Sequence, residues 1–161
     1  MRLLKLLDER FEEIILVAIL AIMVILVFMQ VCMRYVFQAS LSWSEELARY
    51  MFLWIIWLGA AYATKEGSHI SLDFITSRLP RKGQLVTSTL KYFIWISFTI
   101  FIAYISWKLT FLIFQRGQVS AALRIPMGFA YASIPFGMTL MLFRIIENGV
   151  KYFKKGGEGI E

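Results

Sequence analysis

The stretch SWSEELARYMFLWIIWLGAAYATKEGSHISLD, residues 42–73, decides the fold class because it places a short apolar run between two groups of charged residues. Only Tyr50 to Thr64 is free of charge. As a helix this run covers roughly 22 Å, against roughly 30 Å of hydrocarbon in a bilayer. The charged flanks must therefore lie near the bilayer boundary, where charges usually need a partner.

The beginning of this stretch predicts the start of a helix. Ser42 followed by Glu45 matches the capping-box pattern, and Glu45 with Glu46 would place negative charge at the positive end of the helix dipole. Arg49 lies four residues after Glu45 and three after Glu46, so pairing within the helix is available. Two interpretations stay open: a solvated pair that stabilises little, or a contact with another subunit.

The composition is that of an integral membrane protein. Of the 161 residues, 59% are hydrophobic and 16% aromatic, whereas soluble proteins contain about 45–50% apolar residues. We expect an all-α integral membrane protein that forms a single four-helix domain over residues 1–161. Its four transmembrane helices are predicted at about 14–33, 43–66, 84–114 and 125–146.

Two amphipathic segments, at about 1–13 and 70–79, are predicted to form short interfacial helices on the cytoplasmic surface. The third span is long for a bilayer and must tilt or project from it. Lys108 lies about one and a half turns from the outer end of this span, close enough for its amine to reach the surface.

Two features of the fourth span bear on its shape and packing. Pro135 in its middle predicts a kink. The pairs Gly128 with Ala132 and Ser133 with Gly137 place small residues one turn apart, which permits close helix approach.

The net charge of +6 reflects topology rather than nucleic-acid binding. With four spans, both termini lie on one side, which we expect to be cytoplasmic. Eleven basic residues fall on that side: Arg2, Lys5, Arg10, Lys65, Arg78, Arg81, Lys82, Lys91, Lys151, Lys154 and Lys155. Four fall on the other: Arg34, Arg49, Arg116 and Arg124.

The chain lacks the residues that most membrane chemistry requires, so we expect no catalytic residue, no cofactor and no metal site. His69 is the single histidine and Cys32 the single cysteine, which excludes a bis-histidine haem or a histidine-rich zinc site within one chain. No acidic residue lies in the middle of a predicted span, although a self-contained proton-driven transporter would be expected to hold one. That transporter therefore remains a minor alternative.

The opening stretch resembles the signature of the small membrane subunit, DctQ-like, of tripartite ATP-independent periplasmic (TRAP) transporters. The resembling residues form an ordered set: Arg34-Tyr35, Trp43, Glu45-Glu46, Arg49-Tyr50, Trp54, Leu58-Gly59-Ala60-Ala61, Lys65-Glu66-Gly67, His69, Ile70 and Asp73. The similarity in length and helix count extends over nearly the whole chain.

The resemblance implies a scaffold subunit that does not bind substrate, in the inner membrane of a bacterium. Its partners would be membrane lipids, a large DctM-like subunit that moves an organic acid inward with sodium ions, and a periplasmic substrate-binding protein. The overall sequence pattern most resembles that of sialic acid transporters. Dicarboxylates are the other substrate class that the resemblance implies. A generic membrane assembly or accessory subunit is the alternative.

Under this resemblance, contacts with the other subunits are expected at the matching residues of the signature: Arg34, Tyr35, Trp43, Glu45, Glu46, Arg49, Trp54, Lys65, Glu66, His69 and Asp73.

Overall fold

The computed structural model describes residues 2–65 and 81–154. Its helices are α1 (Arg2–Tyr35), α2 (Ser42–Lys65), α4 (Arg81–Gln115), the four-residue α5 (Gly128–Tyr131) and α6 (Ser133–Lys154). Four helical segments are long and apolar enough to cross a membrane: Glu12–Tyr35, Ser42–Lys65, Val86–Gln115 and Gly128–Tyr152. No strand occurs in the described part of the chain, so the predicted all-α membrane fold with four spans is confirmed.

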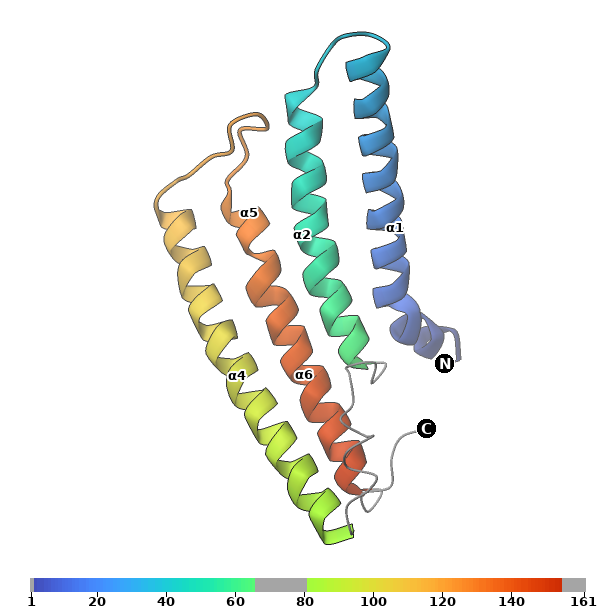
Figure 1. The fold of residues 1–161 in the computed structure, drawn as a ribbon, viewed down its shortest axis with the longest axis vertical. Coiled ribbons are helices and arrows are strands. Elements are labelled where there is room, and N and C mark those ends of the chain that lie inside the picture. Colours follow the sequence, from blue (N-terminus) through green and yellow to red (C-terminus); the bar gives the residue numbers. More distant parts are fainter. Residues whose placement is uncertain (1, 66–80, 155–161) are drawn as a thin grey trace.

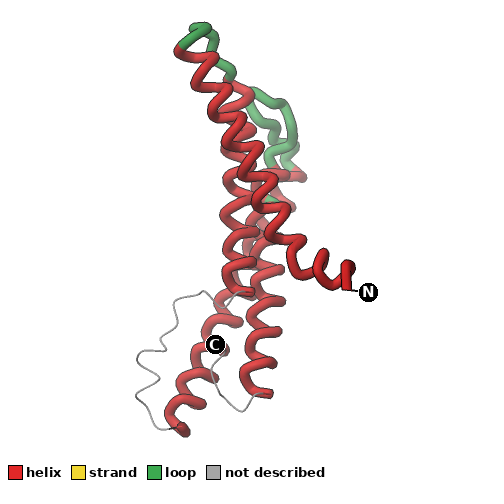
Figure 2. The backbone as a smooth tube through the Cα atoms, turned by 90° about the vertical axis from the view of Figure 1, so that its right-hand side faces the viewer, coloured by secondary structure: helices red, strands yellow, loops and turns green. Residues whose placement is uncertain are grey.

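The four long helices lie side by side in one row, in the order α1, α2, α6, α4 (Figure 1). In the perpendicular view they overlap into a narrow body (Figure 2). Among the described elements α1 packs on α2 alone, and α4 packs on α5 and α6, so α1 and α4 are the two edges of the row. The row is staggered, with α4 and α6 displaced along its long axis relative to α1 and α2 (Figure 1).

The two ends of the row differ in what they carry. The beginning of α1 and the end of α6 lie at one end, called here the termini end (Figure 1). The connections 36–41 and 116–127 lie at the other, called here the loop end (Figure 1). Which end faces the cytoplasm is not fixed by this arrangement, so a cytoplasmic location of both termini stays a prediction.

The first residues of α1 are continuous with its membrane span. The helix runs from Arg2 to Tyr35, and its first part turns away from the long axis of the row (Figure 2). The interfacial helix expected at about 70–79 lies outside the described residues.

Small and hydroxyl-bearing residues form the face of α4 that packs on α6. Two of the hydroxyl groups donate within the helix: Thr99 to the Trp95 carbonyl at 2.8 Å, and Ser106 to the Ile102 carbonyl at 2.7 Å. Small side chains without unsatisfied polar atoms allow close helix packing in a membrane. The buried residues recur at alternating steps of four and three: Thr99, Ala103, Ser106, Thr110 and Ile113.

Gly137 brings α6 into close contact with α2. A Cβ atom at this position would lie 2.6 Å from the Trp57 Cβ and 2.7 Å from the Trp57 carbonyl oxygen. Both distances are shorter than real contacts, so only glycine fits without moving a helix. Ser133, one turn earlier, is fully buried, and this small pair lies at the tight packing that its spacing predicts.

The fourth span is interrupted at Ala132, between α5 and α6. Pro135 has no N–H, so the Tyr131 carbonyl, four residues earlier, loses its helical donor. The Thr110 hydroxyl of α4 donates to this carbonyl at 3.3 Å. Because a carbonyl in a bilayer must find its donor within the protein, Thr110 makes the interruption tolerable. Pro126 precedes α5 and belongs to the connection 116–127.

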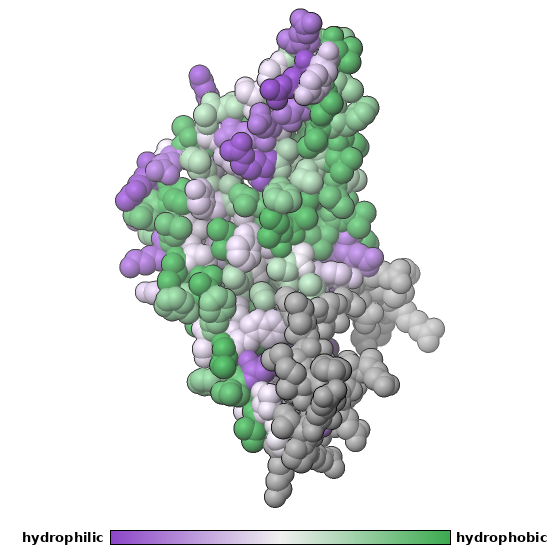
Figure 3. Space-filling model, viewed as in Figure 1, coloured by the Kyte–Doolittle hydropathy of each residue, from purple (hydrophilic) through white to green (hydrophobic). Residues whose placement is uncertain are grey.

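Apolar side chains cover much of the surface of the row (Figure 3). No described side chain of α1 is buried, and Ile25 and Phe28 are 66% and 69% exposed. Such exposure would be unfavourable in water but suits lipid or another membrane protein. The structure therefore shows a wall one helix thick, with two faces available for contact.

Candidate functional site

Polar side chains gather at both ends of the row. At the loop end, two hydrogen bonds close the first turn of α2: the N–H and the hydroxyl of Ser44 both donate to the Leu41 carbonyl, at 3.2 and 2.8 Å. Ser44 is fully buried. These bonds hold the beginning of α2, and Glu46 follows half a turn later.

Glu46 holds the connection 116–127 against α2. Its Oε2 accepts the backbone N–H of Ala122 at 2.8 Å and of Leu123 at 3.0 Å, while the Tyr50 hydroxyl donates to Oε1 at 3.2 Å. Hydrogen bonds from two adjacent amides to an ionised carboxylate are stronger than neutral ones. Glu46 and Tyr50, with these two amides, form what we name the Glu46 cluster.

The connection 116–127 has a defined conformation of its own. Val119 and Pro126 face each other in an isolated antiparallel bridge. Two backbone bonds close it, from Ser120 to the Ile125 carbonyl at 2.9 Å and from Met127 to the Gln118 carbonyl at 2.8 Å. The turn between them needs a left-handed residue, and Arg124 adopts it with φ of 54°. This geometry aims the two amides at Glu46.

Trp54 extends the same contact toward the fourth span. Its indole N–H donates to the Phe129 carbonyl at 3.2 Å, and its ring lies 5.8 Å from the ring of Phe136. α2 thus holds the connection, α5 and the beginning of α6 through two side chains, Glu46 and Trp54, that the sequence analysis assigned to contacts with other subunits.

The other signature residues at the loop end are exposed. Arg49 and Glu45 are exposed and form no ion pair with a described residue, so the intrahelical pairs that their spacing allows are not made. Together with three further exposed residues they form what we name the loop-end surface: Arg34, Tyr35, Trp43, Glu45 and Arg49.

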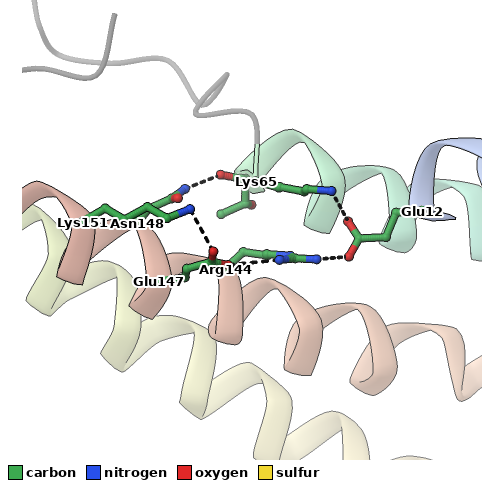
Figure 4. A network of polar contacts seen from close by, with 7 residues as sticks. Glu12, Lys65, Arg144, Glu147, Asn148 and Lys151 are labelled. Atoms are coloured by element: carbon green, nitrogen blue, oxygen red, sulfur yellow. Dashed lines mark hydrogen bonds and ion pairs between the residues drawn. The ribbon is translucent and has the colours of Figure 1, made fainter. Parts of the chain in front are cut away.

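At the termini end, ion pairs join three helices (Figure 4). Arg144 of α6 binds Glu12 of α1 through one nitrogen, and Glu147 at 3.0 Å through another. Lys151 binds Glu147 at 2.8 Å, and Lys65 of α2 lies 4.0 Å from Glu12. We name these five residues the Arg144 cluster.

Burial makes this cluster more than a set of surface pairs. The side chains of Arg144 and Glu12 are 19% and 24% exposed, and removing one partner would leave a poorly solvated charge. Next to them, the Asn148 side-chain amide donates to the Thr64 carbonyl at 2.6 Å, at the end of α2 (Figure 4). The cluster is the one place where α1 is held by α6 as well as by α2 among the described residues.

Sequence reasoning missed most of the Arg144 cluster. Lys65 was expected at a subunit contact, whereas here it lies beside Glu12; Glu66, His69 and Asp73 lie outside the described residues. A signal was present: Arg144 is a cation inside an apolar run, with Glu147 three residues on. Its partner Glu12, 132 residues away, could not be identified without the helix order.

The chemistry available to these two clusters is structural. All described acidic side chains in the spans lie within two turns of a span's end: Glu12, Glu13, Glu45, Glu46 and Glu147. Those that are engaged accept hydrogen bonds from backbone amides or cations, which fixes helices and connections in place.

Comparison with known proteins identifies the family. The pattern described as "Tripartite ATP-independent periplasmic transporters, DctQ component" matches residues 23–155. A Haemophilus influenzae protein provisionally named a TRAP transporter small permease protein is 43% identical over 74 residues, 46% of this chain and 46% of that protein.

Two further relatives match over more of the chain. The isethionate TRAP transporter permease protein DctMQ of Oleidesulfovibrio alaskensis is 30% identical over 88% of this chain and 23% of its own length. The sialic acid TRAP transporter small permease protein SiaQ of Vibrio cholerae is 29% identical over 91% of this chain and 84% of its own length. The chain thus spans less than half the length of the first two relatives.

The family match covers most of the chain: the last three candidate spans in full and the second part of the first span. It confirms the resemblance drawn from residues 42–73. The chain is a multi-pass membrane protein that belongs to the DctQ component family of tripartite ATP-independent periplasmic transporters.

Proposed function

We propose that this chain is the small, non-substrate-binding subunit of a sodium-driven transporter for an organic acid, in the inner membrane of a bacterium. It packs against the large membrane subunit and works with a periplasmic substrate-binding protein. The observation that carries the proposal is the single row of helices: a wall one helix thick encloses no path across the membrane (Figures 1 and 2). A transport path must therefore be formed by another chain.

The comparisons support a large partner subunit. In the DctMQ protein, the part similar to this chain makes up 23% of the polypeptide. A large subunit that corresponds to the rest of such a polypeptide is the proposed partner of this chain. The loop-end surface, Arg34, Tyr35, Trp43, Glu45 and Arg49, is exposed and is proposed to meet the large subunit or the binding protein.

The substrate is proposed from the names of relatives and from the family resemblance. Those relatives transport isethionate and sialic acid by name, and the resemblance adds dicarboxylates. All three are organic anions. We place sialic acids first, following the family resemblance; the sialic acid relative matches 91% of this chain and the isethionate relative 88%.

Reconstitution tests the function directly. The purified chain, the large subunit and the binding protein are placed in liposomes, separately and together, with an inward sodium gradient. Uptake of labelled sialic acid, a C4-dicarboxylate or isethionate is expected with all three proteins and lost when any one is left out. Uptake by this chain alone would contradict a scaffold role and favour a self-contained transporter. Full uptake in its absence would favour an accessory subunit.

A further inference from the structure

α4 carries a second stripe of residues on the side opposite its packing face. This outward stripe follows the same alternating steps of four and three residues as the buried face, and its aromatic members Tyr104 and Phe111 are 68% and 64% exposed. The stripe consists of Ser97, Phe101, Tyr104, Lys108, Phe111 and Gln115, all exposed.

This spacing is the one that helices use when they pack nearly parallel to one another. α6 occupies the opposite face of α4, and no other described long helix contacts α4. Because α4 is an edge of the row, a further helix could lie along the outward stripe without displacing any part of this chain (Figure 1).

The composition of the stripe separates it from a lipid-facing surface. The hydrocarbon core of a bilayer offers no partner for a tyrosine hydroxyl or an ammonium group, yet the stripe contains Tyr104 and Lys108. The opposite edge of the row, α1, exposes hydrocarbon side chains in its span. The hydropathy surface shows the contrast: green dominates the α1 edge on the right, whereas purple and white interrupt it along the α4 edge on the left (Figure 3).

Lys108 is the decisive member of the stripe. It lies seven residues before Gln115, the end of α4, which places it about 10 Å below that end. Helical side chains lean toward the start of their helix, so that of Lys108 leans away from the nearer end of the span. Lys108 is exposed and has no ion-pair partner among the described residues. Its amine can reach the surface only by extending against this lean, so an anion at its own depth would satisfy the ammonium group more directly.

We propose that the outward stripe of α4 packs against a transmembrane helix of the large subunit, and that this helix presents a carboxylate to Lys108. The inference rests on the proposed function, since it assumes a large membrane partner, and it assigns that partner to one edge of the row. On this assignment the span of α1, the other edge, faces lipid, and the loop-end surface is left for the binding protein.

Site-specific photo-crosslinking tests the assignment in the assembled complex. The chain and the large subunit are co-expressed with p-benzoylphenylalanine in place of Phe111, and in a second preparation in place of Phe28. Phe28 is the matched control, because it is also a phenylalanine in a span, with 69% exposure on α1 against 64% for Phe111. Irradiation is expected to join the large subunit to the Phe111 preparation at least several-fold more than to the Phe28 preparation.

The outcomes separate the inference from the function beneath it. If the tagged chain retains the large subunit but Phe111 gives no adduct, or Phe28 alone gives one, the assignment to α4 is wrong and the function stands. Lys108 would then be bound by a lipid phosphate. If the large subunit is not retained at all, the proposed function fails together with the inference.

A charge variant tests the carboxylate. Lys108→Glu is expected to lower the amount of co-purified large subunit several-fold, while Lys108→Arg keeps it, and the chain alone remains monodisperse in detergent in both cases. Arg116→Glu is the control, because it makes the same charge change at an exposed residue just beyond the end of α4. Equal recovery with Lys108→Glu and wild type, or an equal loss with Arg116→Glu, would contradict a specific pair.

Discussion

Glu45 and Glu46 are adjacent in sequence, but their carboxylates have different surroundings and different roles. Glu46 accepts two backbone amides of a connection 76 and 77 residues away in sequence, whereas Glu45 is exposed without a described partner. One helical step of rotation about α2 accounts for the difference. The pair therefore provides a natural comparison between a carboxylate that holds the fold and one that is free for a partner.

Replacing Glu46 should loosen the connection that it holds. Glu46→Ala removes the acceptor for the Ala122 and Leu123 amides, so residues 116–127 should open more often. Trypsin cleavage after Arg116 and Arg124 is expected to accelerate several-fold in detergent. Glu45→Ala, at the neighbouring position, should cleave at the wild-type rate, and an equal acceleration in both variants would show that Glu46 has no special role.

The Arg144 cluster should contribute measurably to stability. Arg144→Gln leaves Glu12 and Glu147 without their shared cation. Because these side chains are partly buried, the expected loss lies between surface and buried pairs, about 1–3 kcal/mol. Lys151→Ala is the control, since Lys151 is 57% exposed and should change stability little. Thermal unfolding of the two purified variants measures the difference. Equal melting temperatures for Arg144→Gln and Lys151→Ala would contradict a stabilising role of the Arg144 cluster.

At the scale of the elements, Gly137 controls the distance between α2 and α6. Gly137→Ala would place a methyl group 2.6–2.8 Å from Trp57 atoms, two of them backbone atoms that cannot rotate away. Overpacking of this kind costs about 1–3 kcal/mol. Gly59→Ala is the matched control, because nothing lies within 4 Å of the added atom and helix propensity favours alanine by up to about 1 kcal/mol. In thermal unfolding, the melting temperature of Gly137→Ala should fall below that of the wild type, and that of Gly59→Ala should stay the same or rise.

Features of these elements that depend on neighbouring residues could be predicted from the sequence, whereas those that depend on contacts between distant segments could not. The apolar runs are local, and they were enough for the all-α class and the four spans. The order of the helices in the row depends on which faces fit, such as Gly137 against Trp57, and no single run contains that information.

The role of Glu46 was out of reach of the sequence for a similar reason. It depends on the conformation of the connection 116–127, which includes a left-handed Arg124. Arginine rarely adopts that conformation, so nothing in the residue types indicates it. The sequence did single out this region of α2, because the charged flanks of a short apolar run need partners wherever those partners lie.

At the scale of the whole molecule, the distribution of basic residues predicts the orientation of the row. Eleven of these residues belong to the side of the termini and four to the other, and the richer side remains in the cytoplasm. In a Cys32→Ala background, Gln38→Cys at the loop end should react with a membrane-impermeant maleimide in spheroplasts. Lys151→Cys, near the termini end, should react only after lysis. The reverse pattern would invert the topology.

The single row also has a mechanical consequence. The bending stiffness of a plate falls steeply as it becomes thinner, so a wall one helix thick resists deformation within its plane far better than perpendicular to it (Figure 2). By itself such a wall would flex with the curvature of the bilayer. Packed along its α4 edge on a thicker subunit, the row would become more rigid. In turn it would enlarge the area that this subunit occupies in the membrane. Stiffness would then be a property of the assembled complex rather than of this chain alone.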